Sequence, residues 1–274
     1  RPYRRAYAGG RSGFDPADNL CAAGHYGAYP GEMAQMVTVS LLSTKSVSRH
    51  FGGLIAVQDV DFDLPKGEIR ALIGPNGAGK TTFVSMLCGR IPVSSGRITF
   101  QGKDVTQLPA HKRIQQGMAY TFQITSIFAE LSVYENVALA VQPRLSNAIN
   151  TLAQEVETAL RRVGLQEHSH RTAGDMAYGH QRLLEIAMGL GQSPQLLILD
   201  EPTQGLSDAE VDDFITLIKE VAQTTTVLLI EHNINVVMAL ADRITVMNFG
   251  QIIAEGSPDE IRQNDAVQTA YLGG

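Results

Sequence analysis

The chain has 274 residues, 44% of them hydrophobic and 18% charged, which is enough for one large or two closely joined globular units. Its formal net charge of −6 argues against nucleic acid as the main partner, because nucleic-acid-binding domains usually carry a basic excess. No apolar run approaches the roughly 18 residues of a membrane span, and we see no signal-peptide core. We therefore expect any membrane role to come through partner proteins.

Composition changes sharply near Met33. Residues 1–32 are rich in glycine, proline, arginine and tyrosine and show neither helical nor strand periodicity, so we expect a disordered extension. A Tyr/Arg/Gly contact segment with a function of its own is the alternative. Because residue 1 is not methionine, we expect Met33 or Met36 to be the natural start. The extension then covers residues 1–36, and one folded domain covers 37–274.

The folded part begins with two strands, over 41–48 and 54–64, joined by a turn at Phe51-Gly52-Gly53. An apolar strand at 69–73 leads into Gly74-Pro75-Asn76-Gly77-Ala78-Gly79-Lys80-Thr81, and a helix begins at Thr82. This segment matches the nucleotide-binding pattern GxxxxGK[ST], in which backbone N–H groups surround the β-phosphate. Lys80 would add a positive charge and the Thr81 hydroxyl could ligate Mg²⁺. A glycine-rich turn that only caps a helix is the alternative.

The middle of the chain is predicted to be helical. A strand at 97–100 is followed by a region, near 124–190, in which 156–163 and 181–190 have helical spacing. Gly164 is expected to end the first of these helices. Cys21 and Cys88 suggest no disulfide and fit a reduced cytoplasm.

The second half of the chain alternates strands with helices. The strand at 196–199 consists of four apolar residues, which predicts burial on both faces of a parallel sheet, and it ends in Asp200-Glu201. Ligands of such sheets bind beyond the carboxyl ends of the strands. Asp200 would hold Mg²⁺ through a water, and Glu201 would polarise the water that attacks the γ-phosphate. A solvated Asp-Glu turn is the alternative.

Further elements are expected in the order helix, strand, helix, strand, strand, helix, over 208–222, 226–230, 234–241, 243–247, 252–256 and 258–263. This alternation predicts an α/β fold with a mostly parallel sheet and helices on both faces. His232 follows the strand at 226–230, so its imidazole should lie at the same sheet edge as Glu201, within reach of the γ-phosphate. The remaining histidines lack metal-ligand spacing and are expected to be structural or solvated: His25, His50, His111, His168 and His170.

Residues 37–274 resemble the nucleotide-binding subunit of an ATP-binding cassette (ABC) transporter. The family's further motifs occur in the expected order: a glutamine loop, a signature, a D-loop and a switch histidine, at Tyr120-Thr121-Phe122-Gln123, Met176-Ala177-Tyr178-Gly179-His180-Gln181-Arg182, Gly205-Leu206-Ser207-Asp208 and Ile230-Glu231-His232. The resemblance implies a P-loop NTPase fold with a mostly parallel sheet, an antiparallel β subdomain and an inserted α-helical subdomain at about 124–190.

The resemblance also implies ATP as the nucleotide and assigns further roles. Phe51 resembles the aromatic position that stacks on adenine. Gln123 could offer its amide oxygen to Mg²⁺ and its NH₂ group to the attacking water, although an exposed loop glutamine is the alternative. The signature departs from the common Leu-Ser-Gly-Gly-Gln, with Ala177, Tyr178 and His180 at three of its positions. Backbone N–H groups at Ala177 and Gly179 would then contact the partner subunit's nucleotide. Asp208 would contribute from the D-loop.

The signature tail at 181–187 and the ending at 270–273 resemble branched-chain amino-acid importer ATPases. This implies an ATPase at the cytoplasmic face of the cell membrane that pairs with a second ATPase subunit, identical or related. Two integral-membrane permease subunits, contacted by residues such as 126–128 and 131–136, and indirectly a substrate-binding protein, would complete the transporter. A lipopolysaccharide-type exporter ATPase is the alternative within transport. A soluble ABC protein of DNA repair or translation is disfavoured, because the chain has one cassette and no coiled-coil insertion.

Overall fold

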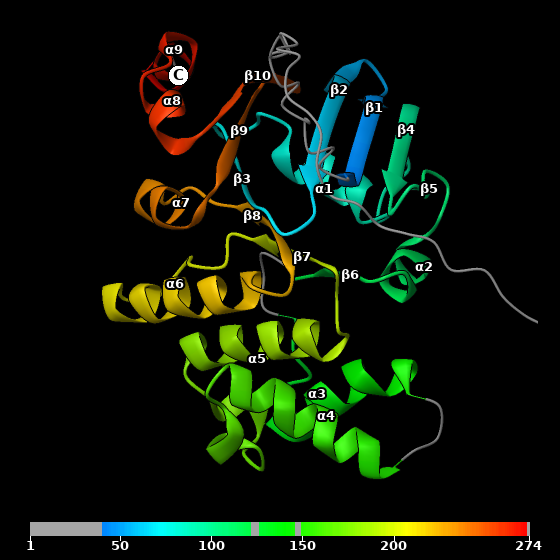
Figure 1. Ribbon diagram of the computed structural model, residues 1–274, viewed down its shortest axis with the longest axis vertical. Coiled ribbons are helices and arrows are strands. Elements are labelled where there is room, and N and C mark those ends of the chain that lie inside the picture. The colour runs from blue at the N-terminus through cyan, green and yellow to red at the C-terminus, as the bar shows by residue number, and fades with distance from the viewer. Residues whose placement is uncertain (1–39, 122–125, 146–148, 273–274) are drawn as a thin grey trace, which may run out of the picture. The chain divides into compact units, whose positions relative to one another are not determined.

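The structure is a computed structural model that describes residues 40–121, 126–145 and 149–272 (Figure 1). Contacts within the chain define a compact unit over Thr38–Gly274. The predicted extension at 1–36 and the expected magnesium ligand Gln123 lie outside the described residues. None of the described helices is long and apolar enough to cross a membrane.

The central sheet has six strands in the order β10-β9-β3-β8-β7-β6. All neighbouring strands are parallel except β9 and β10. The strands are β3 (Ile69–Ile73), β6 (Met118–Tyr120), β7 (Leu196–Asp200), β8 (Thr226–Ile230), β9 (Arg243–Asn248) and β10 (Gln251–Gly256). Because β3, β7 and β8 are parallel, the phosphate loop, Glu201 and His232 all follow strands at one edge of the sheet.

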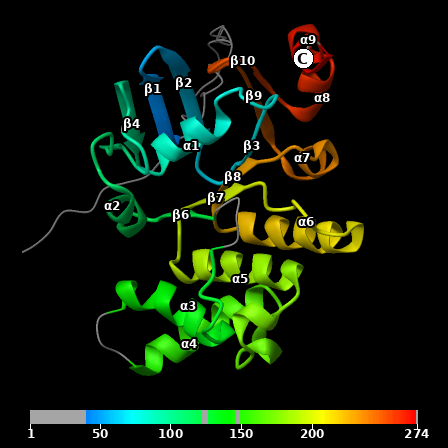
Figure 2. The ribbon, with the colours of Figure 1, turned by 180° about the vertical axis from the view of Figure 1, so that it is seen from behind.

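A second sheet is antiparallel, with the order β2-β1-β4-β5. Its strands are β1 (Ser40–Phe51), β2 (Leu54–Pro65), β4 (Ser95–Phe100) and β5 (Lys103–Asp104). Helix α1 (Lys80–Leu87) lies between the two sheets (Figures 1 and 2), and its buried residues share one apolar core with residues of both. Helix α2 (Ala110–Gln115) precedes β6.

Both faces of β7 and β8 are buried, because alternate side chains enter different cores. Ile198 and Leu228 pack with α1 in the core between the sheets. Leu197 and Leu229 pack on the opposite face, in the core that includes residues of α5 (Tyr178–Gly191) and α6 (Asp208–Ala222). The continuous apolar runs of these strands follow from this two-sided burial.

The remaining helices form two groups. Helices α3 (Val133–Val141) and α4 (Ile149–Arg162) lie beyond α5, away from the antiparallel sheet, in both ribbon views (Figures 1 and 2). Short 3₁₀ helices occur near them at Gln142–Arg144, Gln166–His168 and Ala173–Asp175. A third core joins β3 and β9 to α7 (Ile234–Leu240), α8 (Pro258–Arg262) and α9 (Asp265–Leu272).

The predicted strands at 69–73 and 226–230 and the predicted helix at 208–222 are confirmed to the residue. Both strands of the first hairpin and the helices near 156–163 and 181–190 are confirmed but longer than predicted. Four described elements outside the expected helical region were not predicted: α2, β5, β6 and α9. Strand β6 has three residues, too few for an alternating pattern, and its burial depends on its pairing with β7.

Candidate active site

The phosphate loop owes its shape to glycines. Gly79 has φ 97°, a left-handed conformation that favours glycine, and a side chain there would come within 2.5 Å of the Ala56 carbonyl oxygen. Gly74 has φ 149°, and a Cβ on it would collide with the carbonyl oxygen of Met247. The loop is therefore packed closely against β2 and β9. No described side chain caps the N-terminus of α1, so its first N–H groups face the loop without a side-chain acceptor.

Lys80 is the first residue of α1 and is 6% exposed. Its ammonium donates hydrogen bonds to the carbonyl oxygens of Gly74, at 2.7 Å, and Pro75, at 3.1 Å. Burial lowers the pKa of Lys80, while the negative charges of Glu201 and Asp200 oppose that shift. The two carboxylates therefore help to keep a partly desolvated ammonium charged beside the loop.

Asp200 ends β7, Glu201 follows it, and the two side chains have different partners. Asp200 is 1% exposed, and one of its carboxylate oxygens accepts a hydrogen bond from the Tyr120 hydroxyl at 2.7 Å. Burial raises the pKa of Asp200, and the Tyr120 hydrogen bond opposes the rise. Glu201 has φ 48°, and its side chain points to His232, whose Nε2 lies 2.9 Å from Glu201 Oε1. A left-handed backbone at a non-glycine residue costs free energy, and such residues cluster at functional sites.

The geometry of Asp200 fits a magnesium ligand. Its Oδ1 is buried without a hydrogen-bond partner among the described residues, which is costly unless a cation or water completes it. In the described part of the chain no three His, Cys, Asp or Glu side chains could hold a metal ion by themselves. Magnesium in nucleotide sites needs no such cage, because one or two carboxylates, water and phosphate oxygens suffice. Thr81, another expected ligand, follows Lys80 in α1 and is exposed.

One cavity of about 480 Å³ brings several of the predicted residues together. Residues 76–81 of the phosphate loop, Glu201 and His232 all line it, whereas Gly74, Pro75 and Asp200 do not. Its complete lining is Leu54, Ile55, Ala56, Asn76, Gly77, Ala78, Gly79, Lys80, Thr81, Thr82, Glu201, His232, Phe249 and Gly250. The cavity therefore combines N–H donors, an ammonium, a carboxylate and an imidazole, the groups that phosphoryl transfer to water requires.

Phe249 is a lining residue that sequence reasoning missed. Its ring is 85% exposed and its φ is 45°. The adjoining Gly250 donates its N–H to Ala78 of the phosphate loop at 2.9 Å and accepts from Gln58 N–H at 2.9 Å, so the turn between β9 and β10 is tied to the nucleotide cavity. The available signal was an aromatic residue beside a glycine between two apolar runs, which by itself suggests only a turn.

Phe51, the residue expected to stack on adenine, is not among the lining residues of this cavity. It ends β1, is 44% exposed and carries the Arg49 guanidinium 4.5 Å from its ring centroid. The hairpin that follows does line the cavity, through Leu54 and Ile55.

The signature residues lie away from the phosphate-loop cavity of their own chain. Ala177 is the residue before α5, and no described side chain caps that helix. Gly179 is buried against the first turn of α6, where a Cβ would collide with the Glu210 carboxylate. Asp208 begins α6, one residue after Ser207, which forms a capping box with Glu210. Ala177, Gly179 and Asp208 therefore do not contribute to the cavity that holds Lys80 and Glu201.

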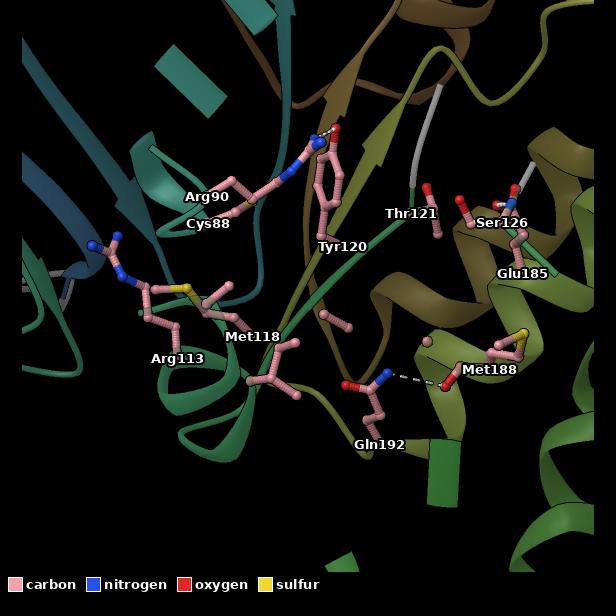
Figure 3. Close-up of a pocket in the computed structure, with 14 residues that line it drawn as sticks. Cys88, Arg90, Arg113, Met118, Tyr120, Thr121, Ser126, Glu185, Met188 and Gln192 are labelled. Atoms are coloured by element: carbon pink, nitrogen blue, oxygen red, sulfur yellow. Dashed lines mark hydrogen bonds between the residues drawn. The ribbon is translucent and has the colours of Figure 1, made fainter. Parts of the chain in front are cut away.

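A second cavity, of about 200 Å³, lies between β6 and helix α5 (Figure 3). Arg90 and Tyr120 point toward one another in it, with a 3.3 Å hydrogen bond from the guanidinium to the phenol oxygen. Since the same phenol bonds Asp200, the wall of this cavity is connected to the predicted magnesium ligand. Glu185, on the opposite wall, pairs with Arg182 at 2.9 Å, and burial raises its pKa.

Comparison with known proteins agrees with this geometry. Residues 57–204 match the family model described as "ABC transporter", and residues 251–274 match "Branched-chain amino acid ATP-binding cassette transporter". The high-affinity branched-chain amino acid transport ATP-binding protein LivG of Salmonella typhimurium is 41% identical, over 85% of this chain and 98% of its own. The lipopolysaccharide export system ATP-binding protein LptB of Escherichia coli is 32% identical, over 86% of this chain and 98% of its own.

Solved structures give the same assignment. The ADP conformation of MJ1267, an ATP-binding cassette of an ABC transporter, aligns with a TM-score of 0.77 at 27% identity, over 86% of this chain and all of that chain. The predicted P-loop fold with its mostly parallel sheet is thereby confirmed. The chain belongs to the ABC transporter family, as an ATP-binding and ATP-hydrolysing subunit whose relatives include the branched-chain amino acid transport ATPases.

Proposed function

We propose that this chain hydrolyses ATP to drive import of branched-chain or similar amino acids through separate membrane subunits. The observation that best supports ATP hydrolysis is the 2.9 Å contact between Glu201 and His232 in the cavity of the phosphate loop. The names of the relatives that are 39–41% identical support the substrate class. The exporter alternative has the weaker support of a relative at 32% identity.

In the proposed mechanism Lys80 and the loop N–H groups hold the phosphates. The ammonium exchanges its two carbonyl acceptors for the β- and γ-phosphate oxygens, which are stronger partners because they are charged. Thr81, Asp200 and Gln123 would hold Mg²⁺, which neutralises charge on the transferring phosphate when it is bound. The buried Oδ1 of Asp200 supports its part in this assignment.

Glu201 is proposed to accept the proton of the attacking water. The Nε2–H of His232 can donate to this carboxylate and hold it in place, and once ATP is bound the imidazole could turn to the γ-phosphate instead. The N–H groups of Ala177 and Gly179, together with Asp208, are assigned to the nucleotide of a second ATPase subunit, since none of the three lines the cavity of this chain. Adenine is assigned to Phe51 from its resemblance to the family's stacking position, although of the two aromatic residues only Phe249 lines the cavity.

The proposed assembly contains a second ATPase subunit, identical or related, two permease subunits and, indirectly, a substrate-binding protein at the cytoplasmic face of the membrane. We propose that the permease subunits contact residues 126–128 and 131–136, where Ser126 lines the cavity of Figure 3 and Phe128 is exposed. We further propose that residues 37–274 are the ABC domain, with its helical subdomain at about 124–190, and that 1–36 are an extension.

Uptake of labelled leucine tests the proposal in cells that lack this chain but keep the permeases and the binding protein. The parent chain should restore uptake, and Glu201→Gln, expressed to the same level, should not. Restoration by both chains would separate uptake from hydrolysis at Glu201. Restoration by neither, with lipopolysaccharide export rescued instead, would favour the exporter alternative.

A further inference from the structure

A buried carboxylate, Glu231, lies directly behind the Glu201–His232 pair. Glu231 follows the last residue of β8 and is 3% exposed. A carboxylate at such a position destabilises the fold unless hydrogen bonds compensate it, because its charge has lost the stabilisation of water. Its partners therefore indicate what it does.

The two oxygens of Glu231 serve two different loops. Oε2 accepts hydrogen bonds from the backbone N–H groups of His232, at 2.8 Å, and Asn233, at 3.0 Å, in the loop after β8. Oε1 accepts a hydrogen bond from the backbone N–H of Thr203, at 3.1 Å, and another from the Thr203 hydroxyl, in the loop after β7. One side chain thus connects the two loops that carry Glu201 and His232.

The connection lies next to the proposed catalytic contact on both sides. Thr203 is two residues after Glu201, and His232 follows Glu231 in the chain. Asn233 in turn contacts α7, because its side chain accepts hydrogen bonds from the N–H groups of Asn235 and Val236 and so caps that helix. Glu231 therefore restrains the backbone of His232 relative to both the end of β7 and the start of α7.

We propose that Glu231 is a positioning residue that holds His232 against Glu201 by bridging the loops after β7 and β8. The proposal rests on the roles given above to Glu201 and His232. A carboxylate suits the task, since all four hydrogen-bond partners are donors. Glutamine has one acceptor oxygen, so its NH₂ group would oppose the N–H groups of one loop. The Thr203 hydroxyl adds to the bridge without touching the nucleotide cavity.

Substitutions at Thr203 and Glu231 test the bridge by kcat and KM for ATP in the assembled transporter. Thr203→Val replaces the hydroxyl with a methyl group and should lower kcat severalfold at unchanged KM. Thr203→Ser keeps the hydroxyl and should behave as the parent. Glu231→Gln should lower kcat by about 10- to 100-fold, the range for a displaced reacting group. Thr216→Val is the matched control, because its hydroxyl bonds a backbone carbonyl on the exposed side of α6.

A double-mutant cycle with His232→Ala distinguishes positioning from general support of the fold. In the His232→Ala background, Glu231→Gln should change kcat by less than about twofold, because no imidazole remains to be positioned. The same loss as in the parent background would overturn the proposal, as would a rise in KM together with a fall in melting temperature for Thr203→Val. A His232→Ala variant with parental turnover would instead refute the role of His232 itself, and the positioning proposal with it.

Discussion

Replacing Glu201 with glutamine separates proton transfer from nucleotide binding. The change keeps the size of the side chain and one oxygen for the His232 contact, which spans 2.9 Å in the parent. Glutamine adopts the left-handed backbone at this position, φ 48°, about as readily as glutamate, so we expect little structural change. What disappears is the basicity of the carboxylate and its negative charge.

The expected loss of turnover is about 10²- to 10⁴-fold, the usual contribution of a positioned base. This corresponds to about 3 to 5 kcal/mol in the activation barrier. Affinity for ATP should be unchanged or higher. The carboxylate helps to keep Lys80 charged, which favours binding, but it also repels the phosphates from within the same cavity. Its loss therefore has opposing effects on binding and a single large effect on the chemical step.

Phosphate release and ATP binding are measured separately, with the related ATPase subunit present if the chain does not pair with itself. The Glu201→Gln chain should accumulate as an ATP-bound pair that elutes earlier from a sizing column. Lys80→Ala should instead lose ATP binding, because it removes the ammonium held at the phosphate loop. Glu220→Gln, on the exposed side of α6, is the matched control and should behave as the parent. Near-normal turnover by Glu201→Gln, with binding and pairing intact, would refute Glu201 as the base.

Three further changes test other parts of the structure. Phe51→Ala should weaken ATP binding by about 1 to 3 kcal/mol, as for loss of base stacking, in a calorimetric titration. A larger effect of Phe249→Ala would instead assign adenine stacking to Phe249. Glu135→Gln should lower thermal stability at neutral pH. The capping box with the helix start lowers the pKa of Glu135, so its contribution is present above the ordinary carboxyl pKa and is lost as pH falls through the lowered value. The difference from the parent should therefore shrink in acid, and a constant difference would contradict this origin. Gly250→Ala should destabilise the fold more than Gly102→Ala. Both glycines have positive φ, at 77° and 72°, but only at Gly250 would an added Cβ meet backbone, 2.7 Å from a carbonyl oxygen. Equal melting temperatures for the two variants would refute the close packing at Gly250.

The sequence by itself determined the nucleotide loop, the strand-end carboxylates and most of the helices and strands. These features are local: a loop motif between a strand and a helix, apolar runs of a strand's length, and helical spacing ended by glycine. Two-sided burial of β7 was also readable, since its first four residues, 196–199, are all apolar. Parallel pairing then required Glu201 and His232 to emerge at the same sheet edge.

Tertiary structure decided which side chains at that edge touch. Glu201 and His232 are far apart in the chain, and their 2.9 Å contact depends on the left-handed turn at Glu201. Tyr120 bonds Asp200 only because β6 pairs with β7, and a strand of three residues leaves no periodic signal. Glu231 looked like the neighbour of a switch histidine, but its bond to Thr203 joins two loops. The periodicity of a segment indicates which of its own faces is buried. It does not indicate which side chains of other segments will lie beside it, because that depends on how the strands pair in the sheet.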